Sequence, residues 1–198
     1  MRIGLIAYRG GNIRSIRSAL ESLGVEIVYS RDPAELSSCG GIVFPGVGAA
    51  APAMEDLQAT GLHTWIPTYT RPFLGICLGM QLLCARSEEG NVPGLGVFPL
   101  PVERFQKAPR IPHIGWNRIT FSAEDPLFEG IPKESYVYFV HSYRTPVSSY
   151  YTIAQAVYGE SFSAALRRDN FWGVQFHPEK SGVVGQQILA NFVRICRS

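Results

Sequence analysis

The feature that most constrains the fold of this chain is a short segment around Cys77, where one periodicity of apolar residues changes directly into another. Residues 73–76 form an apolar run typical of a buried strand, and residues 78–82 then follow the spacing of a helix. Gly75 and Gly79 lie two positions before and after Cys77. Because a sharp turn from strand to helix leaves room only for small neighbours, the pattern predicts a nucleophile elbow, Gly-x-Cys-x-Gly.

An elbow would place the sulfur of Cys77 at the N-terminus of a helix. The unpaired backbone N–H groups there favour a thiolate over a thiol, and they can hydrogen-bond an oxyanion that forms beside the sulfur. The alternative is that Cys77 only packs, since cysteine is among the residue types most often buried. Cys77 alone does not decide between these two interpretations.

The motif His177-Pro178-Glu179 follows a second apolar run, residues 172–176. Residues two apart in an extended chain project to the same side, and Pro178 favours an extended conformation of His177. We therefore expect His177 to be a base that Glu179 orients, beside Cys77 at the C-terminal ends of parallel strands, where ligands collect. The alternative is a surface loop with an ordinary histidine and a solvated glutamate. The elbow favours a Cys-His-Glu triad.

A third motif, Pro45-Gly46-Val47-Gly48, follows the apolar run of residues 41–44. Two glycines around one residue let backbone N–H groups turn toward a ligand. We expect Val47 and Gly48 to supply an oxyanion donor near Cys77. A plain turn between a strand and a helix is the alternative.

The order of the predicted elements indicates the class of fold. Strands are expected at residues 3–7, 25–28, 41–44, 73–76, 102–105, 117–121, 136–140, 151–157, 163–167 and 172–176. Helices are expected at residues 13–23, 51–59, 63–69, 78–82 and 183–195, with a short one opened by Asp32-Pro33. Alternating strands and helices in the first half predict an α/β protein with a mostly parallel central sheet and helices on both faces. Closely spaced strands in the C-terminal half predict an antiparallel extension.

Length and composition exclude several classes of protein. The 198 residues predict a single domain over residues 1–198, and 46% hydrophobic with 17% charged residues indicates a globular chain. The net charge of +2 comes with scattered basic residues, so no nucleic-acid partner is expected. No apolar run reaches the roughly 18 residues of a membrane span, and residues 3–7 are too short for a signal peptide. Four cysteines without paired spacing (Cys39, Cys77, Cys84 and Cys196) predict reduced thiols, a cytoplasmic location and no metal or other cofactor.

At this point the motifs resemble a family. Residues 75–81, Gly-Ile-Cys-Leu-Gly-Met-Gln, together with His177-Pro178-Glu179 resemble the class I, or triad, glutamine amidotransferases. Residues 113–117 (His-Ile-Gly-Trp-Asn) and 136–143 (Tyr-Val-Tyr-Phe-Val-His-Ser-Tyr) are similar to the glutaminase subunits of imidazole glycerol phosphate synthase within that family. The resemblance runs over nearly the whole chain, from about Gly10 to Phe192.

The resemblance implies a reaction and roles for the motif residues. Cys77 would attack the side-chain amide of glutamine, His177 would move the proton, and Glu179 would orient His177. The N–H of Leu78 and one N–H of residues 47–48 would stabilise the oxyanion, and water would then release glutamate. The residues implied to hold glutamine are Gln81, Glu89, Ser142 and Tyr143. Glu89 suits the α-ammonium group, because a buried cation needs a paired carboxylate.

The resemblance also implies a partner. Ammonia would pass to a (βα)8-barrel cyclase subunit in a heterodimer that makes imidazole glycerol phosphate for histidine biosynthesis. The residues expected to face that subunit are Asn12, Trp116, Asn117 and Lys180. A core position is the alternative for Trp116.

The sequence departs from the family pattern at Ala7-Tyr8-Arg9, where Asp-Tyr-Gly is usual, and at residues 49–52. Because the first departure lies near the expected partner face, a paralogous glutaminase that serves another synthase, such as a sugar-amidating enzyme, stays open. So do a free-standing triad cysteine hydrolase and a regulatory module without turnover.

Overall fold

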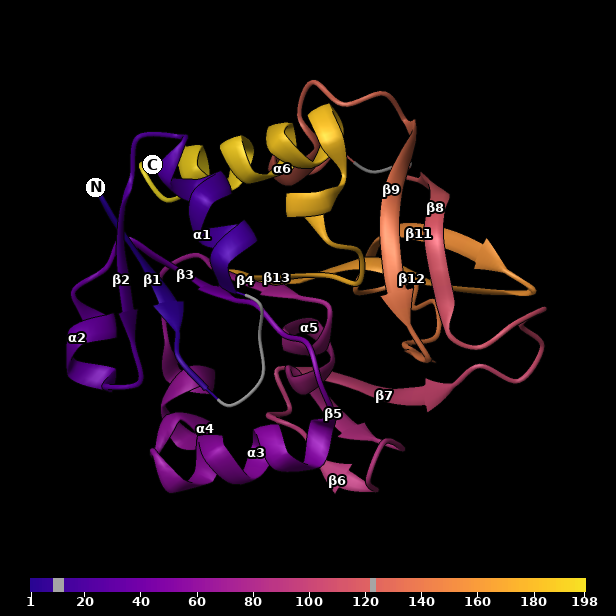
Figure 1. The fold of residues 1–198 in the computed structure, drawn as a ribbon, viewed down its shortest axis with the longest axis horizontal. Coiled ribbons are helices and arrows are strands. Elements are labelled where there is room, and N and C mark those ends of the chain that lie inside the picture. Colours follow the sequence, from indigo (N-terminus) through magenta and orange to yellow (C-terminus); the bar gives the residue numbers. More distant parts are fainter. Residues whose placement is uncertain (9–12, 122–123) are drawn as a thin grey trace.

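The computed structural model describes residues 1–8, 13–121 and 124–198, and Figure 1 gives the order of their helices and strands. The larger sheet contains β1 (Arg2–Ile6), β2 (Glu26–Ser30), β3 (Gly41–Phe44), β4 (Phe73–Ile76), β8 (His113–Thr120), β9 (Glu134–His141), β11 (Thr152–Tyr158), β12 (Glu160–Arg168) and β13 (Phe171–Val174). The smaller sheet contains β5 (Cys84–Ser87), β6 (Val92–Pro93), β7 (Phe98–Arg104) and β10 (Tyr143–Arg144). The helices are α1 (Ile13–Glu21), α2 (Pro33–Ser37), α3 (Ala50–Ala59), α4 (Leu62–Trp65), α5 (Leu78–Leu82) and α6 (Gly182–Ile195), with 3₁₀ turns η1 (Ile66–Thr68), η2 (Pro126–Phe128) and η3 (Pro178–Lys180).

The larger sheet has the order β2-β1-β3-β4-β13-β12-β11-β8-β9 among the described strands. Strands from β2 to β13 in this order pair in parallel, and those from β13 to β9 pair antiparallel. The predicted parallel sheet with an antiparallel extension is therefore confirmed. Strand β13 pairs directly with β4, with Gly173 opposite Gly75 and Val174 opposite Ile76. Because paired parallel strands end at the same edge, Cys77 and His177 follow neighbouring strand ends.

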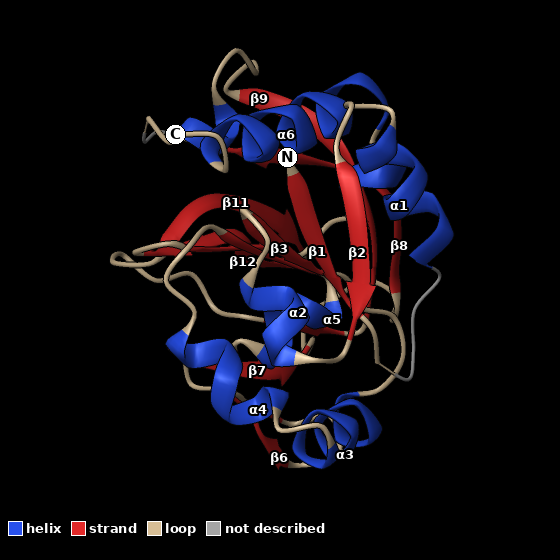
Figure 2. Ribbon diagram, turned by 90° about the vertical axis from the view of Figure 1, so that its left-hand side faces the viewer, coloured by secondary structure: helices blue, strands red, loops and turns tan. Residues whose placement is uncertain are grey.

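Helices cover both faces of this sheet, as Figure 2 shows. An apolar layer lies between each face of the sheet and its helices. The layer on one face includes Ile16 of α1 and Phe192 of α6, and the layer on the other includes Leu57 of α3 and Leu62 of α4. Alternate residues of the strands supply the two layers, which bury apolar side chains on both sides of the sheet. None of the helices in the described parts of the chain is long and apolar enough to cross a membrane. All four cysteines are free thiols.

Local signals in the sequence predicted several elements closely. The side chain of Asp32 accepts a hydrogen bond from the N–H of Ala34 at 2.8 Å and so caps α2, as the Asp-Pro pair predicts. The strand expected over residues 172–176 ends at Val174, and Gln175 and Phe176 form a bend. The smaller sheet was only partly expected. Strands β5, β6 and β10 have only two to four residues, and prolines in β6 and β7 weaken the strand pattern there.

The smaller sheet fixes the segment after β9. Tyr143 of β10 pairs with Arg104 of β7. The guanidinium of Arg144 contacts the carboxylates of Glu103 at 2.9 Å and Glu160 at 2.6 Å, so it links β7, β10 and β12. Two sets of contacts therefore fix the backbone of Tyr143. Strand β7 pairs with it, and the neighbouring residue Arg144 is anchored by two largely buried ion pairs.

Gly79 provides a first test of the elbow. A Cβ atom on Gly79 would overlap the carbonyl oxygen of Phe44, which is rigid backbone of β3. We expect Gly79→Ala to lower the free energy of unfolding by about 1–3 kcal/mol, in spite of the helix propensity of alanine. Urea unfolding measures this. Gly40→Ala is the matched control, because its Cβ would meet the flexible side chain of Met1 at 3.3 Å and the carbonyl oxygen of Cys196 at 3.5 Å, an ordinary contact distance. Equal unfolding midpoints for the two variants would contradict the prediction.

Candidate active site

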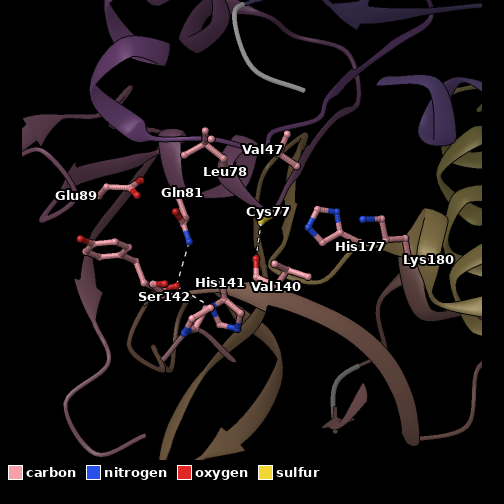
Figure 3. A pocket seen from close by; sticks show the side chains of 13 residues that line it. Val47, Cys77, Leu78, Gln81, Glu89, Val140, His141, Ser142, His177 and Lys180 are labelled. Carbon is pink, nitrogen blue, oxygen red and sulfur yellow. Dashed lines mark hydrogen bonds between the residues drawn. The ribbon is translucent and has the colours of Figure 1, made fainter. Parts of the chain in front are cut away.

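A pocket of about 310 Å³ opens at the C-terminal ends of β4 and β13 (Figure 3). Its lining comes from the elbow, the turn after β3, the segment after β5, the residue before β8, the segment from the end of β9 into β10 and the turn after β13. The residues that line it are Val47, Gly48, Cys77, Leu78, Gln81, Glu89, Pro112, Val140, His141, Ser142, Tyr143, His177 and Lys180. Most of the residues that the sequence and the resemblance single out therefore meet at one place, although they come from distant parts of the chain.

Cys77 forms the predicted turn between strand and helix. Its φ of 53° and ψ of −110° lie in a region that residues with a Cβ rarely adopt, at a cost of about 1–3 kcal/mol. The surrounding backbone holds this conformation: the N–H of Cys77 donates to the carbonyl of Val174 at 2.8 Å. In Figure 3, Cys77 lies between the ring of His177 and the amide of Gln81. The sulfur thus faces a pocket, and the side chain is more than a packing element of the core.

His177 and Glu179 are in direct contact. Nδ1 of His177 lies 2.9 Å from Oε1 of Glu179, and the two side chains are only 4% and 8% exposed. His177 is extended, with φ −99° and ψ 98°, as Pro178 predicts. The prediction that the chain continues straight to Glu179 is wrong, because residues 178–180 form a 3₁₀ turn that brings the carboxylate back to the ring.

The contacts of His177 decide its charge. Burial by itself lowers the pKa of His177, but hydrogen bonds and charge interactions with Cys77 and Glu179 outweigh it and raise that pKa to about 10. Because Nδ1 contacts Glu179, Nε2 is the ring nitrogen that is left to interact with Cys77. A positively charged ring beside a sulfur is the arrangement that stabilises a thiolate.

The two segments expected to bind an oxyanion lie together. The turn after β3 passes so close to α5 that a Cβ on Gly46 would lie 2.6 Å from Cβ of Leu78. Val47 and Gly48 line the pocket, and Gly48 has a φ of 113°, which glycine adopts readily. The N–H of Leu78 donates to the carbonyl of Gly46 at the long distance of 3.4 Å. A weak bond of this kind is easily exchanged for a stronger acceptor.

The expected glutamine subsite forms the other side of the pocket. Nε2 of Gln81 donates to the carbonyl of Tyr143 at 3.1 Å and to Oε1 of Gln175 at 2.9 Å. Both amide hydrogens are used in this way, so the Oε1 of Gln81 is an acceptor for a ligand. Glu89 accepts a hydrogen bond from the N–H of Ala50 at 2.9 Å, and burial raises its pKa. An amide oxygen and a carboxylate on one side of a pocket suit an ammonium group.

Several residues of the site escaped sequence reasoning. Gln175 is fully buried, and its Nε2 donates to the sulfur of Cys77 at 3.6 Å. Val140 and His141 line the pocket, and the carbonyl of Val140 lies 3.7 Å from the same sulfur. Gln175 carried a usable signal, because it is a polar residue inside an apolar strand pattern. The hydroxyl of Tyr8 is buried near Gly46 and has no hydrogen-bond partner among the described residues.

The residues expected at the partner face have different positions. Asn12 lies outside the described residues. Trp116 is 56% exposed, so the alternative of a core position is wrong. Lys180 is exposed at the mouth of the pocket. The amide of Asn117 is engaged inside the chain, because its Nδ2 donates to the carbonyl of Val157 at 2.9 Å.

Comparisons with known proteins agree with this geometry. The family model "Glutamine amidotransferase class-I" matches residues 5–196. The imidazole glycerol phosphate synthase subunit HisH of Bacteroides fragilis is 48% identical over 98% of this chain and 100% of its own length. The HisH subunit of Methanosarcina barkeri is 45% identical over 98% of this chain and 99% of its own length.

Solved structures share the fold at low identity. A glutamine amidotransferase structure has a TM-score of 0.77 at 19% identity and covers 99% of both chains. Another, from Thermotoga maritima, has a TM-score of 0.71 at 16% identity and covers 100% of this chain and 99% of its own. These structures support the architecture, while the family model and the sequence relatives cover almost every residue. On that evidence the chain belongs to the class I glutamine amidotransferases, as a relative of the HisH subunits within that family.

Proposed function

We propose that this protein is the glutaminase subunit of imidazole glycerol phosphate synthase. It hydrolyses glutamine to glutamate and ammonia and delivers the ammonia to a cyclase subunit in histidine biosynthesis. The observation that supports this most is the meeting of Cys77, His177 and Glu179 at one pocket, in a chain 48% identical to a HisH subunit. The free thiols of all four cysteines fit a reducing cytoplasm.

The proposed reaction begins at the sulfur of Cys77, which attacks the side-chain amide carbon of glutamine as His177 holds the thiol proton. Negative charge then develops on the amide oxygen, where the N–H of Leu78 and one N–H of residues 47–48 can stabilise it. The carbon–nitrogen bond breaks, and His177 gives the proton to the leaving ammonia. Water then attacks the γ-glutamyl thioester with His177 as base and releases glutamate.

The proposed partner is a (βα)8-barrel cyclase subunit that binds over the mouth of the pocket. Ammonia released into bulk water would be protonated and lost, so its acceptor must lie close to the site. The outer face of the pair β8–β9 carries an exposed row of large side chains. The exposed members of this row are Ile114, Trp116 and Tyr136, and the half-buried Tyr138 packs beside Trp116. An exposed apolar patch of this kind next to a pocket is typical of a protein interface.

The test is the release of glutamate from glutamine by the purified chain, alone and with a cyclase subunit and its ribotide ligand. Activation by the cyclase subunit is the expected result. Equal turnover with and without it would favour a glutaminase for another synthase or a free-standing hydrolase. Hydrolysis of peptides without hydrolysis of glutamine would contradict the proposal. So would a complex with the cyclase subunit that releases no glutamate from glutamine.

The row on β8–β9 predicts the effect of one substitution on the complex. We expect Trp116→Ala to weaken binding of the cyclase subunit by about 30-fold, which corresponds to about 2 kcal/mol for a central aromatic side chain. Titration calorimetry measures the dissociation constant. Tyr150→Ala is the matched control, because Tyr150 is 89% exposed and lies away from the pocket lining. Equal losses of affinity in both variants would contradict the proposed interface.

A further inference from the structure

Two buried histidines beside the glutamine subsite have no part in the proposed reaction: His141 lines the pocket, and His113 is outside its lining. Nδ1 of His113 lies 2.9 Å from Nε2 of His141, and Nδ1 of His141 lies 2.7 Å from the carbonyl oxygen of Tyr143. That carbonyl also accepts the hydrogen bond from Gln81 described above. The two rings are therefore linked by hydrogen bonds to a residue of the glutamine subsite.

The acceptor at one end fixes the direction of every bond in this series. A carbonyl oxygen can only accept, so Nδ1 of His141 must carry the proton and donate to Tyr143. Nε2 of a neutral His141 is then an acceptor, and Nδ1 of His113 must donate to it. Nε2 of His113 in turn faces Nδ2 of Asn117 at 3.4 Å, and an amide nitrogen only donates. Both rings are thus held in the neutral Nδ1–H tautomer.

The surroundings of the rings keep them neutral. His113 and His141 are 3% and 6% exposed, and Phe105, Phe139 and Phe162 surround them. Burial lowers the pKa of His113 to about 4 and that of His141 to about 3. A charged His141 would turn its Nε2 into a donor facing the donor of His113, so the series of bonds depends on neutral rings.

The opposite end of the series reaches the nucleophile. Gln81 donates to the carbonyl of Tyr143 and to Oε1 of Gln175, and Gln175 donates to the sulfur of Cys77. Because a carboxamide has only two N–H groups, these two bonds decide which way the amide of Gln81 points. Without a firmly placed Tyr143 carbonyl, that amide could rotate and present N–H groups to the pocket.

We propose that His141, supported by His113, is a positioning residue for the glutamine subsite. It fixes the carbonyl of Tyr143, so that the amide of Gln81 presents its oxygen to the α-ammonium group of glutamine. This inference rests on the proposed function and adds to it a role for two residues outside the triad. Its direct consequence is on substrate affinity, while the chemistry at Cys77 changes less.

The test is steady-state glutaminase kinetics of the full chain, alone and in complex with the cyclase subunit. We expect His141→Phe, which keeps an aromatic ring and removes both hydrogen bonds, to raise KM for glutamine about tenfold, with kcat within about twofold. His141→Asn should recover most of the affinity, because Nδ2 of asparagine can replace Nδ1 as the donor to Tyr143. A His141→Phe variant with the KM of the unaltered protein would overturn the inference.

The matched control is Phe162→Leu. Phe162 is fully buried and packs on both histidines, with ring centroids 5.1 Å from His141 and 6.0 Å from His113, but its side chain has no polar atom. It should lower the melting temperature and leave KM within about twofold, since it removes packing only. A rise in KM equal to that of His141→Phe would assign the effect to packing and overturn the inference.

A spectroscopic measurement on the unaltered protein covers the case in which His141→Phe does not fold. Nitrogen-15 shifts of the histidine rings should give neutral Nδ1–H tautomers for His113 and His141 from pH 5 to pH 8. An Nε2–H tautomer in either ring, or titration within that range, would overturn the inference. The proposed function is tested separately, because the ring tautomers do not depend on it. It would be overturned if the complex of the unaltered protein with the cyclase subunit released no glutamate.

Discussion

Cys77→Ala will abolish glutamine hydrolysis, with a loss of at least about 10⁴-fold in kcat, and will leave the fold intact. The sulfur is the only atom that the substitution removes, so no other group of the pocket can take its place as nucleophile. The elbow persists because alanine retains the Cβ, and the hydrogen bond from this residue's N–H to the carbonyl of Val174 does not involve the side chain. Glutamate release measures the activity, and circular dichroism measures the fold.

Two further measurements make this result specific. Cys196→Ala, at a free and partly buried thiol outside the pocket lining, should keep full activity. Mass spectrometry of the unaltered protein quenched during turnover should detect a γ-glutamyl adduct on Cys77 and none on the alanine variant. A Cys77→Ala protein that still turns over glutamine would remove the basis of the proposed reaction.

The second large effect is expected from Glu179→Gln, with a loss of about 10³- to 10⁴-fold in kcat, as for the orienting carboxylate of other triads. The amide keeps the size of the side chain but removes the negative charge 2.9 Å from Nδ1 of His177. The pKa of His177 should fall, because Glu179 is one of the two residues that raise it to about 10. The pH dependence of kcat and the ring nitrogen shifts of His177 measure the change. An unaltered His177 pKa in the variant would contradict this role of Glu179.

The contact between His177 and Glu179 also predicts how the free energy of unfolding depends on pH. The pKa of His177 rises from its ordinary value of 6.5 to about 10 on folding, so the folded state binds the proton more tightly. The stabilisation is fully present below pH 6.5 and is lost as the pH rises through about 10. Urea unfolding at pH 6, 8 and 10 should therefore give a difference between the unaltered protein and Glu179→Gln that shrinks with pH. A difference that stays constant would show that another group carries the stabilisation.

The sequence predicted the parts of this protein that depend on neighbouring residues. The cap of α2 by Asp32 and the elbow at Cys77 follow from local chemistry, so their patterns are readable in the chain. The bonds that complete the site join distant residues: Gln175 reaches Cys77, and Gln81 reaches the backbone of Tyr143. No periodicity reports such contacts, because they depend on which strands pair. For the same reason the internal bond of Asn117, expected at a partner face, could not be foreseen.

The pairing of β4 with β13 has a consequence for the synthesis of the protein. The nucleophile follows one of these strands and the base follows the other, and Gln175, which contacts the sulfur, is 98 residues from Cys77 in the chain. A growing chain on the ribosome therefore has its cysteine long before it has the strand that completes the site. Contacts of such long range form late and slowly during folding. An unfinished subunit consequently lacks the complete triad, and glutamine turnover requires that β13, the last strand of the sheet in chain order, has docked.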